Sequence, residues 1–326
     1  LAATRPELQG RPELALQALE GLLVNGMLLT AADAAARLSG GASVAPAATR
    51  VFIITCDRPA AVERLLESLL RNGKLARHEG LYLIDDSRLA ESRVANRELV
   101  AGFNTRSPVD MRYVGEAAQS AMLEGLIARQ PAAEHGLRFL LDPAQWTGHK
   151  TYGRSRTLCL LFSVGYRAIV MDDDVLCQAL LPPVAEEGLA IAGGASRQAA
   201  FFADREELAR AAVPADFDPL SGHASLLGRT VGAVVEAVSP GGMAAQQLQG
   251  VNASLASVLD AGAPILVTQS GSWGDPGTAS PHWVVSLGDT SVVRLLEQEA
   301  SLVDIVEKRC NWLGSPRLSL IKMASM

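Results

Sequence analysis

Short apolar segments alternate with helical patterns along residues 50–171, and this alternation constrains the fold more than any other feature of the sequence. Residues 51–55 form a β-branched apolar run, which is typical of a strand buried on both faces. Residues 81–84 predict a second buried strand, and 111–114 and 167–171 predict two more strands. Buried strands separated by helices predict a mostly parallel sheet covered by helices, so we expect an α/β fold.

Helical signals fill the segments between these strands. Pro59 suits the first position of a helix that carries apolar residues on one side. We also expect helices at 91–100, 117–128 and 154–164, and a further strand at 137–141. Beyond residue 185 the signals weaken, and they predict helices at 224–238, 246–259 and 291–313 and a strand at 264–268.

The first part of the chain has a different pattern. Leucines recur at near-helical spacing within residues 14–23, and Thr30 is a candidate cap for a second helix through Leu38. The stretch 39–49 is rich in Gly, Ser, Ala and Pro, which predicts a linker. The sequence therefore predicts a helical N-terminal segment ahead of the sheet.

The composition is that of an acidic globular protein, with 48% hydrophobic and 20% charged residues, a net charge of −6 and a pI near 5.5. It excludes a disordered chain, and the acidic balance argues against a general nucleic-acid binder. The four cysteines lie far apart without a CxxC motif, which favours reduced thiols and a cytoplasmic location. No stretch reaches the roughly 18 to 20 apolar residues that span a bilayer, so we expect a soluble protein rather than a transmembrane one.

Polar clusters follow three of the expected strands. They are Thr55-Cys56-Asp57-Arg58-Pro59, Asp85-Asp86-Ser87-Arg88 and Asp172-Asp173-Asp174. A single acidic turn is usually a helix cap. Ligands bind at the carboxyl ends of the strands in open α/β sheets, so three such clusters at one edge favour a binding site.

The three consecutive aspartates are the sharpest feature. Strand alternation places Asp172 and Asp174 on one side of the backbone and Asp173 on the other. Neighbouring carboxylates repel each other unless a cation lies between them, and Mg²⁺ or Mn²⁺ suits carboxylate, water and phosphate oxygens. In the alternative interpretation, Asp174 caps a helix that begins at Val175 and the other two carboxylates are solvated.

These motifs together resemble the nucleotide-sugar half of glycosyltransferase family 2, which has the GT-A fold. The resemblance covers roughly residues 50–180 and rests on VFIITCDRP, LYLIDDS, GRSR and the three aspartates, in that order. It implies a Rossmann-like GT-A sheet. It also implies three regions: a helical segment and linker at 1–49, a nucleotide-sugar-binding half at 50–185 and an acceptor-binding half at 186–326.

The resemblance implies roles for the residues after the first two strands. Thr55, Asp57 and Asp86 correspond to positions that hold the base and the ribose of the donor. Arg58 and Asp173 belong to the same expected nucleotide-sugar pocket.

The resemblance also implies a metal-dependent reaction. Asp172 and Asp174 match an Asp-x-Asp motif that holds Mn²⁺ or Mg²⁺ against the donor diphosphate, as a Lewis acid and template. Many members carry Gly-x-x-Arg-Asn where this chain has Gly153-Arg154-Ser155-Arg156, so the usual Asn is missing. Arg154 or Arg156 is a candidate phosphate ligand, and a surface salt bridge is the alternative.

Catalytic candidates lie downstream. The resemblance favours an inverting reaction, in which a carboxylate takes the proton from the acceptor hydroxyl. Asp275 is the candidate base and Trp273 a candidate sugar-stacking residue, with an ordinary Asp-Pro-Gly turn as the alternative for Asp275. His282 is a candidate third metal ligand, whereas a structural role is the more common one for a lone histidine such as His223.

We therefore expect a glycosyltransferase that moves a sugar from a nucleotide-sugar donor to a glycan or another hydroxyl acceptor. Peripheral membrane contact and the oligomeric state stay open. A haloacid-dehalogenase-like phosphatase is a second interpretation, with Asp172 as nucleophile and Asp174 as acid–base, although several strand–helix units precede the motif here. A non-catalytic nucleotide-sugar-binding domain is the third.

Overall fold

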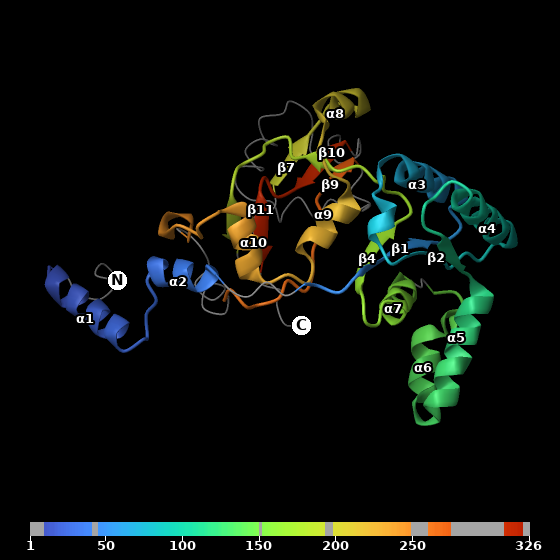
Figure 1. The fold of residues 1–326 in the computed structure, drawn as a ribbon, viewed down its shortest axis with the longest axis horizontal. Coiled ribbons are helices and arrows are strands. Elements are labelled where there is room, and N and C mark those ends of the chain that lie inside the picture. The colour runs from blue at the N-terminus through green and yellow to red at the C-terminus, as the bar shows by residue number, and fades with distance from the viewer. Residues whose placement is uncertain are drawn as a thin grey trace.

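The computed structural model describes residues 10–40, 45–149, 152–192, 198–248, 260–274 and 310–321. A four-stranded parallel sheet flanked by helices forms one side of the molecule (Figure 1). Its strand order is β3-β2-β1-β4. The strands are β1 (Thr49–Thr55), β2 (Gly80–Asp85), β3 (Met111–Val114) and β4 (Arg167–Asp172). The expected α/β fold with a parallel sheet is confirmed.

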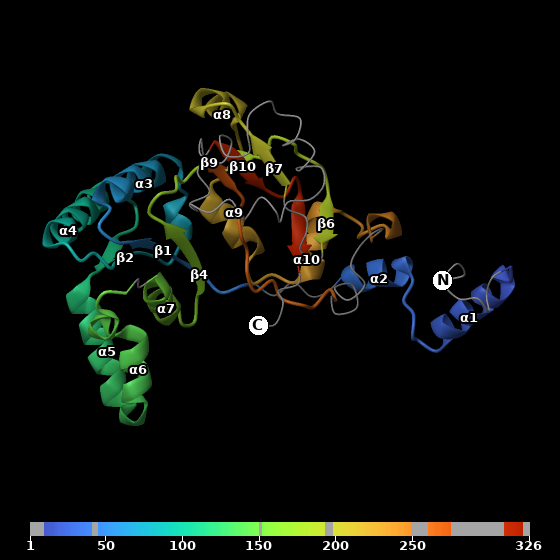
Figure 2. The same ribbon diagram turned by 180° about the vertical axis from the view of Figure 1, so that it is seen from behind.

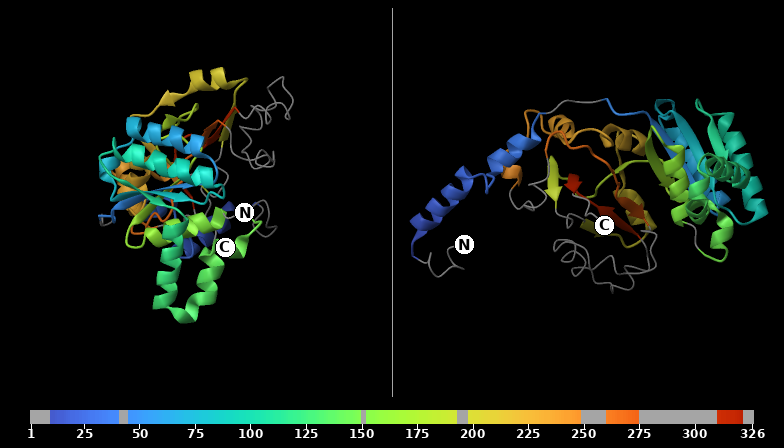
Figure 3. Two further views of the ribbon diagram at one scale, coloured as in Figure 1. Left: turned by 90° about the vertical axis from the view of Figure 1, so that its right-hand side faces the viewer. Right: turned by 90° about the horizontal axis from the view of Figure 1, so that it is seen from below.

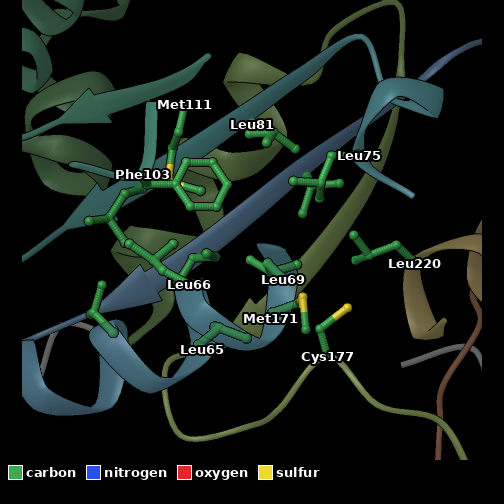
Figure 4. Packing of buried hydrophobic residues seen from close by; sticks show 14 of the residues in the cluster. Leu65, Leu66, Leu69, Leu75, Leu81, Phe103, Met111, Met171, Cys177 and Leu220 are labelled. Atoms are coloured by element: carbon green, nitrogen blue, oxygen red, sulfur yellow. The ribbon is translucent and has the colours of Figure 1, made fainter. Parts of the chain in front are cut away.

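Strand alternation in β1 sends its apolar side chains to both faces of this sheet. Val51 and Ile53 join a core with the helices α3 (Pro59–Asn72) and α4 (Ala90–Asn104), where Leu65, Leu66 and Leu69 of α3 are buried (Figure 4). The opposite face is covered by α5 (Glu116–Arg129), α6 (Glu134–Leu141) and α7 (Tyr152–Phe162). Burial on both faces explains why β1 and β2 contain continuous apolar runs in the sequence.

The C-terminal region is built from shorter elements (Figure 2). Its strands pair as β7-β10-β9, β6-β11 and β5-β8. They are β5 (Leu180–Leu181), β6 (Leu189–Ala192), β7 (Gln198–Phe201), β8 (Val213–Pro214), β9 (Ser272–Gly274), β10 (Asn311–Gly314) and β11 (Leu318–Ile321). Its helices are α8 (Arg205–Ala211), α9 (Pro219–Leu226) and α10 (Val231–Val238). Short 3₁₀ turns occur at Leu75–Arg77, Pro131–Ala133, Pro143–Trp146 and Ala245–Leu248.

The two N-terminal helices differ in how they pack. In α1 (Pro12–Val24) no residue is buried within the part of the chain that is described, and the helix extends away from the other elements (Figure 3). The helix α2 (Ala31–Leu38) begins with the expected cap, since the Thr30 hydroxyl accepts from the Asp33 N–H and the Asp33 carboxylate accepts from the Thr30 N–H. Leu38 is buried in a cluster with residues of α10 and β6. The three-region division stays a prediction.

Two predicted strands are wrong. Residues 137–141 belong to α6, where Leu141 is buried and Phe139 is exposed, and Arg138 pairs with Glu134 one helical turn away. Residues 264–268 form no regular strand. Ile265 exchanges backbone hydrogen bonds with the turn at 228–229, which replaces a ladder to another strand.

The predicted helices beyond residue 185 are only partly correct. The span 224–238 is divided into α9 and α10 by a turn in which Gly228 has a φ of +75°, a conformation that ends a helix. The described end of 291–313 is strand β10, and the described start of 246–259 is a 3₁₀ turn. The rest of both spans lies outside the described residues. No described helix has the length and apolar character needed to cross a membrane.

Candidate functional site

The sheet has one point where the direction of its strand order reverses. The chain runs outward from β1 to β2 and β3, and β4 then pairs with the other side of β1. Ile54 lies opposite Asp172, so the carboxyl ends of β1 and β4 meet. In open α/β sheets, ligands bind outside the strand ends at such a reversal, because the helices that connect the strands on its two sides lie on opposite faces of the sheet. The first and third polar clusters lie at this edge.

Asp173 is the buried member of the three aspartates. One carboxylate oxygen accepts a hydrogen bond from the Thr55 hydroxyl at 2.7 Å, and the other lies 2.9 Å from Nη1 of Arg58. Burial raises the pKa of Asp173, while the Thr55 hydrogen bond and the positive charge of Arg58 act in the opposite direction. Asp173 thus ties β4 to the end of β1.

Asp172 and Asp174 are exposed on either side of it. Their side chains are 54% and 47% exposed. Arg156 lies 3.3 Å from Asp172, and Arg58 lies 3.1 Å from Asp174. The burial of the three aspartates follows the alternation that the sequence predicted.

A divalent cation is compatible with this donor set. Asp172 and Asp174 offer exposed carboxylate oxygens two residues apart in the chain. Mg²⁺ characteristically takes one or two carboxylates and completes its shell with water and phosphate oxygens. Among the described residues, no group of three or more His, Cys, Asp or Glu side chains is arranged to hold a metal by itself. A metal here would therefore complete its shell with water or with oxygens from a bound ligand. His282 lies outside the described residues.

Asp57 holds two loops together. Its carboxylate accepts hydrogen bonds from the backbone N–H groups of Arg88 at 3.0 Å and Leu89 at 2.9 Å, and its own N–H donates to the Ser87 hydroxyl at 2.9 Å. Its φ of +54° is uncommon for a residue with a side chain, although Asp is among the residues that adopt it. These contacts fix the loop after β1 against the loop after β2.

Asp85 is a buried acceptor that the sequence analysis did not assign. Its carboxylate receives hydrogen bonds from the Ser87 N–H at 2.8 Å, the Asn96 amide at 3.0 Å and the Tyr113 hydroxyl at 2.8 Å. Burial raises the pKa of Tyr113, and the hydrogen bond from its hydroxyl to Asp85 and the negative charge of that carboxylate raise it further. Asn96 lies on the same buried stripe of α4 as Val100. A polar residue within an apolar helical stripe is the sequence feature that could have predicted this network.

Asp86 is held from the opposite face of the sheet by Arg154. The Arg154 guanidinium is buried and donates to Asp86, to the Gln119 side-chain oxygen and, at 2.7 Å through Nε, to the Leu141 carbonyl. Gln119 also donates to the carbonyls of Asp85 and Val114 at 2.9 Å. Of the two arginines proposed as phosphate ligands, Arg154 is therefore bound inside the protein, and Arg156 is the exposed one.

The remaining candidates lie in the C-terminal region. Trp273 is half-buried on β9, and its ring stacks on Phe202 with the ring centroids 5.7 Å apart. His223 is bonded to the Thr268 hydroxyl at 2.9 Å, and burial lowers its pKa, which fits the structural role expected for it. Asp275 lies outside the described residues, so its role as base stays a prediction.

No protein-family model, curated protein or solved structure matches the chain.

Proposed function

We propose that this protein is a nucleotide-sugar-dependent glycosyltransferase of GT-A type, which moves a sugar to an acceptor hydroxyl with inversion. The observation that carries the proposal is the position of the three aspartates and Arg58 where β1 and β4 meet, at the reversal of the strand order. Asp86 follows the neighbouring strand β2. A ligand bound across the ends of β4, β1 and β2 would contact both groups.

We assign different parts of the donor to different residues. Asp86, fixed by Arg154, would accept a hydrogen bond from the base or ribose. Arg156 and Arg58 would be the cations beside the diphosphate, since guanidinium groups match phosphate oxygens with two parallel hydrogen bonds. Asp172 and Asp174 would hold the divalent cation, which when bound neutralises charge on the leaving diphosphate.

The transfer itself forms a bond from the acceptor oxygen to the anomeric carbon and breaks the bond from that carbon to the diphosphate. The acceptor proton must leave in the same reaction. We propose Asp275 as the carboxylate that receives it, on the basis of the family resemblance. A cytoplasmic location, and a glycan or another hydroxyl compound as acceptor, are part of the same proposal.

The proposal is tested by thermal-shift measurements with a panel of nucleotide sugars, each with and without Mn²⁺. A ligand that binds the native state alone raises the melting temperature. We expect one donor to raise it in the presence of Mn²⁺ and to be hydrolysed or transferred slowly under the same conditions. Stabilisation without turnover would favour the non-catalytic binding domain, and release of phosphate from small phosphoesters would favour the phosphatase.

A further inference from the structure

Arg58 bridges two of the three aspartates. It precedes Pro59, the first residue of α3, and a single guanidinium nitrogen lies 2.9 Å from Asp173 and 3.1 Å from Asp174. The side chain is 50% exposed, so it is accessible to solvent and to a ligand. Arg58 is thus a counter-charge supplied by the protein itself.

A cation held by Asp172 and Asp174 would compete with this arginine. Both would require the Asp174 carboxylate, and like charges within a few ångströms repel even in a solvated setting. Release of Arg58 does not leave Asp173 without a partner, because the Thr55 hydroxyl still donates to its other oxygen at 2.7 Å. The buried part of the site therefore keeps a hydrogen bond when the arginine moves.

We propose that Arg58 exchanges partners during binding, from the carboxylates of Asp173 and Asp174 to the phosphate oxygens of a nucleoside diphosphate, and so couples nucleotide binding to metal binding. The inference rests on the proposed function. A guanidinium group binds carboxylates and phosphates through the same fork of N–H donors, so both partners suit it. A nucleotide that draws Arg58 away frees Asp174 for the metal, and by linkage the metal favours the nucleotide by the same factor.

Arg156 does not have this role. It contacts Asp172 alone, at 3.3 Å, and both side chains are more than half exposed. Pairs of this kind contribute little and are screened by salt. Arg58 is distinguished by its contact with the buried Asp173.

The test measures Mn²⁺ binding by the loss of the electron paramagnetic resonance signal of free Mn²⁺, for the wild type, Arg58→Gln and Arg58→Lys. A suitable control is Arg106→Gln, which removes an arginine from an exposed pair with Glu67, between the end of α4 and α3. For Mn²⁺ alone, we expect Arg58→Gln to bind about 3- to 10-fold more tightly, since a repelling charge is removed. Arg58→Lys should lie between the two, because an ammonium group is a point charge without the planar fork.

The measurement is repeated with a panel of nucleoside diphosphates. In the wild type we expect the diphosphate to increase Mn²⁺ affinity. In Arg58→Gln we expect this increase to be about 3- to 10-fold smaller, because the contribution of the arginine to the coupling between the two ligands is then lost. Charge neutralisation of the diphosphate by the metal would account for the remainder. Equal or weaker Mn²⁺ binding by folded Arg58→Gln, or an unchanged increase, would overturn the inference while leaving the glycosyltransferase proposal intact. Absence of diphosphate-dependent Mn²⁺ binding in both proteins would overturn the two together.

Discussion

Replacing Arg154 with methionine removes one charged group from the interior and leaves a side chain of similar length. In the native protein the Arg154 side chain is 4% exposed, and its guanidinium donates to Asp86, Gln119 and the Leu141 carbonyl. The Asp86 side chain is itself 11% exposed. The substitution therefore takes the balancing cation from a carboxylate that has little access to water.

The expected loss of stability is about 3 to 5 kcal/mol, the usual effect of breaking a buried ion pair by removing one partner. Arg156→Met on the same helix provides the matched control. The pair of Arg156 with Asp172 is exposed, so its loss should cost about 0 to 1 kcal/mol. Two arginines separated by a single residue are thus expected to differ several-fold in their effect on the free energy of unfolding.

Urea unfolding followed by circular dichroism measures both variants. Arg154→Met should shift the midpoint far more than Arg156→Met. The double variant with Asp86→Asn should lose less than the sum of the two single variants, because both charges are then absent. A loss within about 1 kcal/mol of the Arg156→Met value would refute the buried pair, since only exposed pairs fall in that range.

Three further predictions concern the metal, the base and the effect of pH. Changing Asp172 and Asp174 together to Asn should abolish Mn²⁺-dependent nucleotide binding with little change in melting temperature. The control Glu124→Gln, which changes an exposed acid on α5, should leave this binding unchanged. Unchanged binding in the double variant would contradict the metal site. Asp275→Asn should lower transfer by about 10² to 10⁴ with donor binding intact, and near-normal turnover would remove it from the mechanism. Burial lowers the pKa of His78 from its ordinary 6.5. Below that pH the unfolded state therefore binds more protons than the folded state, so the free energy of unfolding decreases as the pH falls. Stability should therefore fall as the pH drops from 7 to 5, less so in His78→Gln, and equal pH profiles in urea titrations would exclude this contribution.

The central sheet could be predicted because its signals are local. β1 and β2 contain short apolar runs, and burial on both faces requires such a run at that position. The order of the strand ends then placed Thr55 and Asp173 at one edge without knowledge of their contacts. What the sequence could not show is which partner each side chain takes, as for Arg154, whose acceptors Asp86 and Gln119 lie 68 and 35 residues away.

The C-terminal region was predicted poorly for a related reason. Its strands are short, and β10 pairs with β7, which lies more than 100 residues earlier in the chain. A four-residue strand stabilised by distant partners has no periodicity of its own, so residues near Trp312 resembled the end of a helix. Residues 137–141 of α6 were predicted to be a strand, because five residues are too few to distinguish a period of 2 from a period of 3.6.

The aspartates at the edge of the sheet differ in how freely each can change partner. Those that serve as internal acceptors are Asp57, Asp85, Asp86 and Asp173. Loss of any of these contacts would leave a buried donor unpaired or loosen a loop, at about 1 to 3 kcal/mol for each group left unsatisfied. Asp172 and Asp174 are bound through exposed arginines, so an incoming ligand can replace those contacts at little cost. The internal hydrogen bonds therefore fix the loops at this edge of the sheet, and the contacts that a ligand can replace are those that exposed arginines make with Asp172, Asp173 and Asp174.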